Sequence, residues 1–145
     1  MIQGVVVEKL KVIEDKRGKL MHMLRCDSPN FAGFGEIYFS VINYGAIKAW
    51  RQHLRMTQNF AVPSGMVKLV IFDSRDKSPT KGQLLEIELG EKNYCLVKIP
   101  PMLWYGFKGI SGTPSIIANC SDIVHDPDEI IRADLSDVQF SYNWK

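Results

Sequence analysis

The chain has 145 residues, of which 46% are hydrophobic and 23% charged, and its formal net charge is +2. These values are typical of a single globular domain, which we place over residues 1–145. So small a net charge excludes the dense basic stripe of a nucleic-acid-binding protein, although local cations can still hold a small anionic ligand.

The N-terminal stretch MIQGVVVEKL lacks the basic segment and long apolar run of a signal peptide. No apolar run approaches the ~20 residues that a membrane span needs. Three scattered cysteines, Cys26, Cys95 and Cys120, predict reduced thiols rather than a disulfide framework or a zinc knuckle. We therefore expect a cytoplasmic protein that binds neither nucleic acid nor membranes.

Short runs rich in β-branched and aromatic residues alternate with turn formers along the whole chain. The candidate strands, in chain order, are GVVVEKLKVI, KLMHMLR, GEIYFSVINY, IKAWRQHL, NFAV, MVKLVIF, LLEIEL, YCLVKI and PSIIANC. PSG, at residues 63–65, predicts a tight hairpin. The one helical candidate is DPDEIIRADL, with Asp126 as the cap and Pro127 at the first helical position. Many short strands predict an all-β sandwich or barrel.

The segment GAIKAWRQHLRMTQNFAVPSG, residues 45–65, carries one histidine among basic and polar residues. It resembles the first motif of the cupin family, G-x5-H-x-H-x3,4-E-x6-G, whose members are jelly rolls of the double-stranded β-helix type. Arg51 stands at the first histidine position, His53 at the second and Gln58 at the glutamate position. The period of two along a strand predicts that Arg51 and His53 share one face.

The second cupin motif, P-x-G-x-x-H, falls on PPMLWY, where Met102 replaces the glycine and Tyr105 the histidine. A divalent iron, zinc or manganese site needs about three imidazole or carboxylate ligands. Arg51 has no lone pair to donate, which leaves His53 as the one good ligand. We therefore predict no metal and no cofactor, which disfavours a metal-dependent cupin dioxygenase or sugar-phosphate isomerase.

Three further stretches, DKRG (residues 15–18), DSRDKSPTKG (73–82) and IPPMLWYGF (99–107), occur in the order seen in dTDP-4-dehydrorhamnose 3,5-epimerases. The chain resembles these enzymes, and the related dTDP-sugar 3,4-ketoisomerases, over roughly its whole length. R-x-x-S-P-T-x-G is the most specific part, and the tail DVQFSYNW is similar too. The resemblance implies an all-β, single-domain cupin with at most one short C-terminal helix, a homodimer, and metal-free action on a nucleotide-linked 4-keto sugar.

The same resemblance implies an altered catalytic set. The epimerases' base histidine falls on Arg51, and only His53 remains of the two histidines of the ketoisomerases. The epimerases' lysine falls on Gln58, and their acid tyrosine falls near Ala118, which cannot donate a proton. A hydroxyl is available nearby from Tyr105, at the position where the family has the histidine of its HGF stretch.

We assign the remaining groups by their chemistry. His53 can act as the base, since its ordinary pKa near 6.5 leaves much of it neutral at cytosolic pH. Arg51 is always protonated and can stabilise an enolate, while Tyr105 can return the proton. The aspartate that orients the histidine in this family is Asp134 or Asp137, and the sequence does not choose between them.

Four residues are expected to bind the substrate. Arg17 and Lys48 are the predicted diphosphate contacts, by charge and by family position, and Gln58 and Arg75 are the others. The expected function is an epimerase or isomerase of a nucleotide-diphospho-4-keto-6-deoxy sugar, used in making surface polysaccharide. The competing class is a sugar-nucleotide binder that has lost its acid–base set.

Each of these assignments has a structural alternative. A lone histidine such as His53 is often structural, and Arg51 can be a salt-bridge partner inside the barrel. Tyr105 can be an ordinary packing residue, and Arg17 an exposed turn residue. His125 is predicted to be a turn residue.

Overall fold

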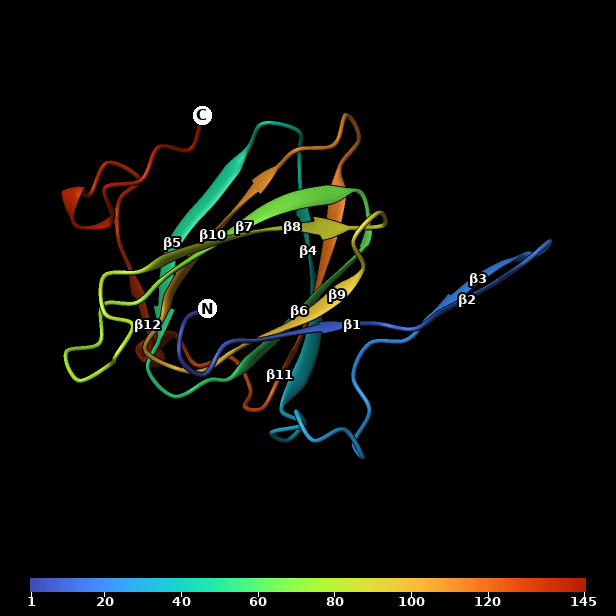
Figure 1. Ribbon diagram of the computed structural model, residues 1–145, viewed down its shortest axis with the longest axis horizontal. Helices are drawn as coiled ribbons and strands as arrows, with labels where there is room; N and C mark the ends of the chain where they lie inside the picture. Colours follow the sequence, from blue (N-terminus) through green and yellow to red (C-terminus); the bar gives the residue numbers. More distant parts are fainter.

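A computed structural model describes all residues 1–145, and nearly all of its regular structure is β-strand (Figure 1). Two five-stranded antiparallel sheets face each other, in the orders β1-β9-β6-β11-β4 and β12-β5-β10-β7-β8, as in a jelly roll. The strands are β1 (Val6–Lys9), β2 (Val12–Asp15), β3 (Gly18–Met21), β4 (Glu36–Ile42), β5 (Ile47–His53), β6 (Gln58–Ser64), β7 (Met66–Phe72), β8 (Leu84–Gly90), β9 (Cys95–Ile99), β10 (Trp104–Gly109), β11 (Ser115–Ser121) and β12 (Ile130–Arg132). The predicted all-β jelly roll is confirmed, and no helix is long and apolar enough to cross a membrane.

The main core lies between the two sheets, because alternate residues of each strand point inward. Val67, Leu69 and Ile71 of β7 follow this period of two, and all three are fully buried. A second, smaller cluster packs the C-terminal tail over the other face of the β5–β10–β7 sheet. There Trp50 stacks on Phe140 with ring centroids 4.2 Å apart.

The sharp turn predicted at PSG is present, but the predicted hairpin is wrong, because β6 and β7 belong to different sheets: β6 pairs with β9 and β11, and β7 pairs with β8 and β10. β6 ends at Ser64, β7 begins at Met66, and Gly65 between them has a φ of +80°. A side chain at Gly65 would also collide with Ser115, so both the backbone angle and the space require glycine here.

The helix predicted in DPDEIIRADL is wrong beyond its first turn. Asp126 caps as expected, since its side chain accepts a hydrogen bond from the Asp128 backbone, and Pro127 follows at the first position. The turn η1 (Pro127–Glu129) is a single 3-10 turn, after which β12 pairs with the edge of β5. The free backbone groups of that edge override the local helix signal.

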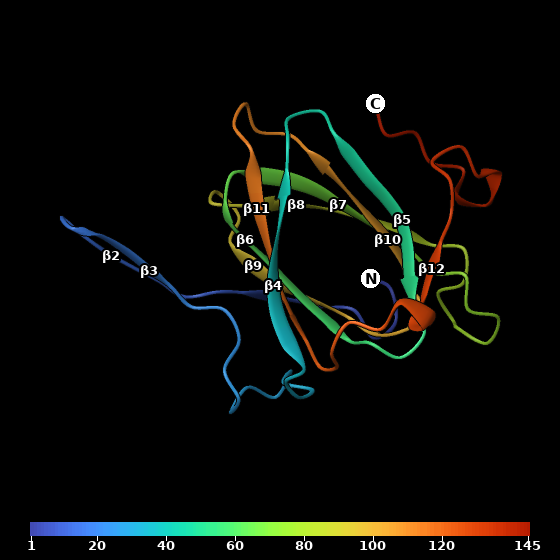
Figure 2. The same cartoon turned by 180° about the vertical axis from the view of Figure 1, so that it is seen from behind.

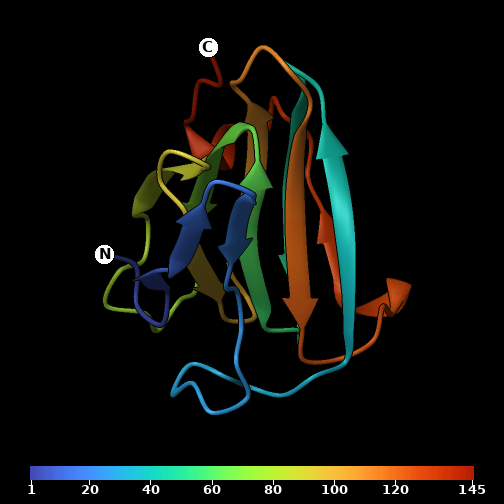
Figure 3. The ribbon, with the colours of Figure 1, turned by 90° about the vertical axis from the view of Figure 1, so that its right-hand side faces the viewer.

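The predicted strand GVVVEKLKVI is in fact two strands. β1 joins the first large sheet beside β9, whereas β2 and β3 form a two-stranded sheet of their own. Figures 1 and 2 show this hairpin projecting away from the body of the molecule, on the side opposite the C-terminal tail. In Figure 3, β4 (cyan) is the outermost strand of its sheet, next to β11.

Candidate active site

His53, the last residue of β5, forms a buried pair with Glu129 from the end of η1. Its Nδ1 contacts Oε1 of Glu129, and the other carboxylate oxygen, Oε2, accepts hydrogen bonds from the backbone N–H groups of Arg55 (3.0 Å) and Met56 (3.2 Å). Burial raises the pKa of Glu129, but these hydrogen bonds outweigh it and hold that pKa below its usual range. The ionised carboxylate favours the tautomer with the proton on Nδ1, which makes Nε2 the ring nitrogen that carries the lone pair and can accept a proton.

Glu129 therefore orients His53, and neither aspartate considered from the sequence does so. Asp134 accepts hydrogen bonds from Ser136, and Asp137 caps the 3-10 turn η2 (Val138–Phe140) through the backbone N–H of Gln139. Glu129 lies 76 residues from His53 and was missed because its segment was predicted to be helical. It reaches the histidine only because η1 is a single turn and β12 pairs with β5.

The hydroxyl of Tyr105 lies 3.2 Å from His53 Nε2, and the two rings are nearly parallel. Burial raises the pKa of Tyr105 well above its usual range, and the neighbouring Tyr38 raises it further. Arg51 and Gln58, which lie beside the hydroxyl, offset only part of this shift. Tyr105 is therefore a neutral phenol, able to donate its proton to Nε2.

Two adjoining cavities open at this point, and both are lined by Tyr38 and Arg51. The outer cleft has a volume of about 420 Å³, within the range of ~300–1,000 Å³ found for small-molecule sites. The inner recess, of about 30 Å³, extends between the two sheets. His53, His125, Glu36, Ile130 and Arg132 complete the outer cleft, and the inner recess is bordered by Tyr105, Lys48, Ser40, Asn119 and three apolar side chains.

The structure brings five of the predicted site residues together. Arg51 and His53 line the same cleft, as the period of two predicts, and Tyr105 lies opposite Arg51 in the pairing of β10 with β5. Gln58 is buried beside the Tyr105 hydroxyl. Lys48 reaches across to β4, where its Nζ donates to the Ser40 hydroxyl (3.0 Å) and to a backbone carbonyl.

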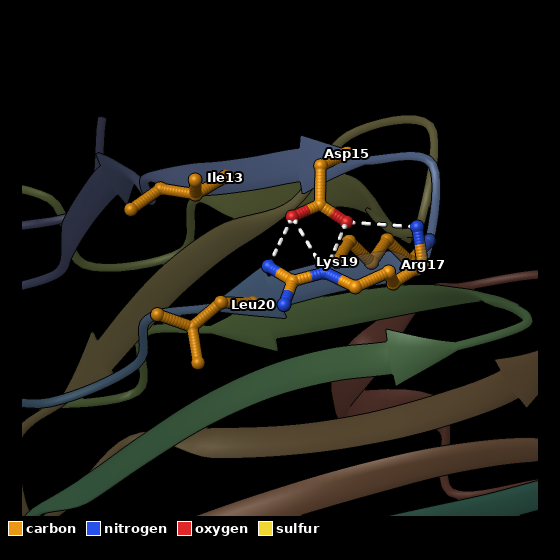
Figure 4. A pocket seen from close by; sticks show the side chains of 6 residues that line it. Ile13, Asp15, Arg17, Lys19 and Leu20 are labelled. Carbon is orange, nitrogen blue, oxygen red and sulfur yellow. Dashed lines mark hydrogen bonds and ion pairs between the residues drawn. The ribbon is translucent and has the colours of Figure 1, made fainter.

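Two predicted substrate contacts lie elsewhere in this chain. Arg17 is at the tip of the β2–β3 hairpin, where its guanidinium pairs with Asp15 (Figure 4). Arg75 lies in the loop between β7 and β8, where it donates two hydrogen bonds to the buried Asp73. Neither side chain borders the two cavities at His53.

Besides the buried Glu129, sequence reasoning missed several residues that line the cleft, among them Tyr38 and Arg132. Tyr38 was read only as part of a strand, and Arg132 only as part of the expected helix. His125, predicted to be a turn residue, lies in the irregular segment before η1 and also borders the cleft. The alternation of β4, which turns Tyr38 inward and Ile37 outward, was the one signal that could have identified Tyr38.

Arg51 and Arg132 give the cleft its charge. They are direct partners in the pairing of β5 with β12, and neither guanidinium forms an ion pair with a carboxylate. Like charges directly opposite each other in a sheet are destabilising. An anion bound between the two guanidinium groups would relieve that repulsion, although Glu36 also borders the cleft.

The donor set does not fit a metal ion. No group of three or more histidine, cysteine, aspartate or glutamate side chains is placed to hold one. Both ring nitrogens of His53 are already engaged, by Glu129 and by Tyr105. Arg51, next to it in the cleft, is a cation without a lone pair.

Two facing antiparallel sheets with a polar cleft between them define a cupin-type jelly roll. The chain belongs to the dTDP-4-dehydrorhamnose 3,5-epimerase family, whose sequence profile matches residues 1–145. A solved structure described as a dTDP sugar isomerase, from Desulfovibrio desulfuricans G20, superimposes with a TM-score of 0.96 at 44% identity, covering 99% of this chain and 92% of that one.

Two further proteins are also similar to the chain. The probable low-salt glycan biosynthesis epimerase Agl13 of Haloferax volcanii is 35% identical over 133 residues, which cover 88% of this chain and 85% of Agl13. The spore coat polysaccharide biosynthesis protein SpsL of Bacillus subtilis is 31% identical over 146 residues, covering 99% and 97% of the two chains.

Proposed function

We propose that this protein is a metal-free epimerase or isomerase that acts on a nucleotide-diphospho-4-keto-6-deoxy sugar, in the cytoplasm, during surface polysaccharide synthesis. The observation that carries the proposal is the buried Glu129–His53 pair, which borders a cleft containing two arginines without carboxylate partners. Membership of a sugar-nucleotide epimerase family and the names of the two relatives support the substrate class and the pathway.

A 4-keto group acidifies the neighbouring C–H bonds, because the electron pair left behind delocalises into an enolate. His53, oriented by Glu129, is the proposed base that removes this proton. Arg51 is the proposed cation that stabilises the enolate oxygen, since its guanidinium lines the same cleft.

The diphosphate is proposed to bind between Arg51 and Arg132, with Lys48 as a further cation at the inner recess. Bidentate guanidinium–phosphate pairs are strong and directional, which suits the facing arrangement of these two arginines. Gln58, buried beside the Tyr105 hydroxyl, is proposed to help position the sugar from within the recess.

We also propose a homodimer. Ile37, Phe39 and Val41 point outward from β4 and are 50–65% exposed, although β4 is the edge strand of its sheet. The β2–β3 hairpin carries the exposed Ile13 and Leu20 on one face (Figure 4), and an isolated two-stranded hairpin is only marginally stable. A second copy that covers both surfaces would account for them.

Dimerisation would also explain the predicted role of Arg17, since in its own chain this residue lies on a projecting hairpin. Light scattering is expected to give about twice the chain mass. Arg17→Ala is expected to weaken nucleotide binding without changing that mass. A monomer at micromolar concentration would contradict the dimer.

A non-catalytic sugar-nucleotide binder is the alternative, and one observation favours it. Ala118 stands where the family has its acid tyrosine, and no alanine side chain can return a proton. Such a protein would keep the cleft and its cations but perform no proton transfer.

Deuterium exchange separates the two functions. The protein is incubated in D₂O with dTDP-4-keto-6-deoxyglucose, and exchange at ring carbons C3 and C5 is followed by NMR. The enzyme is expected to introduce deuterium well above the buffer blank, and His53→Asn is expected to reduce the rate by about 10²–10⁴-fold. The same assay is repeated with the UDP, GDP and CDP forms of the sugar. If deuterium incorporation stays at the level of the buffer blank with all four sugars, although one of them binds, the protein is a sugar-nucleotide binder instead.

A further inference from the structure

The site has two walls, one from each sheet, and its acid–base groups are divided between them. His53 and Tyr105 come from β5 and β10, which are adjacent strands of one sheet, and their side chains are hydrogen-bonded to each other. Tyr38 comes from β4 in the other sheet and borders both cavities. A sugar ring lying between the walls would present one face to His53 and the other to Tyr38.

This division limits what Tyr105 can do. Its hydroxyl is 3.2 Å from Nε2 of the base, so it can return a proton only on the face from which His53 removed it. Inversion of a ring carbon requires that the proton arrive on the opposite face. The wall formed by β4 and β11 must therefore supply the acid for an inverting reaction.

Tyr38 is placed to be that acid. Its hydroxyl oxygen accepts a hydrogen bond from Asn119 Nδ2 at 2.8 Å and donates to no protein group, so its own proton is available. The orientation of the Asn119 amide is fixed, because its Oδ1 accepts from the backbone N–H of Asn59 at 3.2 Å. The Asn119 donor, with Arg51 bordering the same cavities, can stabilise the phenolate that proton donation leaves.

We propose that Tyr38 is the catalytic acid that protonates the enolate on the face opposite His53, an inference that rests on the proposed function. His53 takes the proton, the C–H electron pair moves into the enolate, and the ketone oxygen becomes negatively charged. The enolate carbon then takes the O–H proton of Tyr38, the C=O double bond re-forms, and Tyr38 becomes a phenolate. Solvent returns the proton to Tyr38 and removes the one on His53.

The position of Tyr38 also bears on the loss of the family's acid. Ala118, at the family's tyrosine position, pairs with Phe39 of β4, and the next pair along the two strands is Asn119 with Tyr38. Neighbouring residues of a strand point to opposite faces, so Ala118 turns away from the cleft with Phe39, whereas Tyr38 and Asn119 face into it. Tyr38 would therefore supply the proton from a different position than the family's tyrosine. Tyr105 is then a positioning residue, which holds Nε2 of His53.

The test compares exchange with inversion in the same D₂O reaction. Tyr38→Phe keeps the ring and removes only the hydroxyl, and Tyr44→Phe, at an exposed tyrosine near the end of β4, is the matched control. We expect Tyr38→Phe to incorporate deuterium into the starting sugar at close to the wild-type rate, because His53 still works. Formation of the inverted product is expected to fall by about 10²–10⁴-fold, while Tyr44→Phe changes neither.

The result depends on the ratio of the inversion rate to the deuterium-exchange rate, because a purely structural role for Tyr38 would lower both rates together. Such a parallel loss would overturn the assignment, and so would unchanged inversion in Tyr38→Phe. A wild-type protein that exchanges without inverting would overturn it too, while leaving proton abstraction by His53 intact. Absence of exchange in the wild type with every sugar would instead overturn the proposed function.

Discussion

Two buried carboxylates, Asp73 and Glu129, contact basic side chains in different ways. Asp73 accepts hydrogen bonds from Arg75, Ser78 and Thr80, all within seven residues, and closes a loop on itself. Glu129 reaches a histidine 76 residues away, at the wall of a cleft. The first network is local and complete, so it stabilises a loop, whereas the second orients a ring that can still react.

Glu129→Gln is expected to give the largest effect. The amide can donate as well as accept, so it no longer selects the Nδ1–H tautomer of His53. By analogy with other orienting carboxylates, we expect the rate of deuterium exchange to fall by up to about 10⁴-fold. Asp134→Asn, which changes a surface carboxylate bonded to Ser136, is the control and should retain full exchange. Comparable losses in both variants would show that Glu129 has no special role.

Asp73→Ala should act on stability instead. It leaves Arg75 without its partner, and breaking a buried pair costs about 3–5 kcal/mol, of which we expect the lower end because the arginine is partly exposed. Urea denaturation at pH 7 measures the loss, with Asp76→Ala as the exposed control in the same loop. The rate of deuterium exchange into the sugar, per folded molecule, should be unchanged. A large loss of that rate would show that this loop belongs to the active site.

The loss of stability in Asp73→Ala should depend on pH. Burial raises the pKa of Asp73, but hydrogen bonds from Arg75, Ser78 and Thr80 outweigh it and hold the pKa far below its usual range. A depressed pKa contributes stability that is present above the unfolded value of about 3.9 and is lost as the pH falls below it. The stability difference between wild type and Asp73→Ala should therefore narrow between pH 5 and pH 3. A constant difference would contradict the ionised state of Asp73.

Arg132→Ala should have a smaller effect, limited to binding. A hydrogen bond to a charged group contributes roughly 1.5–3 kcal/mol, so the Kd for dTDP should rise by about 10–150-fold in calorimetry. Arg25→Ala, which removes an exposed arginine paired with Asp27, is the matched control. Equal affinities for wild type and Arg132→Ala would mean that the diphosphate binds elsewhere.

Treatment with a chelator should have no effect. Arg51 and Gln58 stand at ligand positions of the cupin motif, so we expect no stoichiometric iron, zinc or manganese by elemental analysis. EDTA should leave the rate of deuterium exchange unchanged. One metal ion per chain, with exchange that the chelator abolishes, would reject the metal-free chemistry.

The sequence predicted the all-β fold because strand periodicity and turn residues are local signals, as at Gly65. It also predicted that Arg51 and His53 share a face, which follows from strand geometry alone. It did not predict Glu129, because a helix signal in DPDEIIRADL was overridden by pairing with β5. The alternation along β4 indicates that Tyr38 points inward, but no local signal shows that β4 lies opposite His53, so the role of Tyr38 was not predicted.

The motif R-x-x-S-P-T-x-G was the most specific sequence signal, yet Arg75 lies away from the cleft. The structure gives a physical reason, because Arg75, Ser78 and Thr80 all donate to Asp73. The spacing of this motif is the spacing needed to close that loop around one carboxylate. A strong local pattern can therefore report on loop closure, whereas this site depends on contacts between distant strands.

A crystal structure of the wild-type protein with dTDP-glucose, which lacks the ketone and cannot react, tests the central claim most directly. The account predicts the diphosphate within hydrogen-bond distance, roughly 2.7–3.2 Å, of Arg51 and Arg132. It also predicts the sugar ring between His53 on one face and Tyr38 on the other. A nucleotide sugar bound away from His53, with this cleft filled only by water, would contradict it.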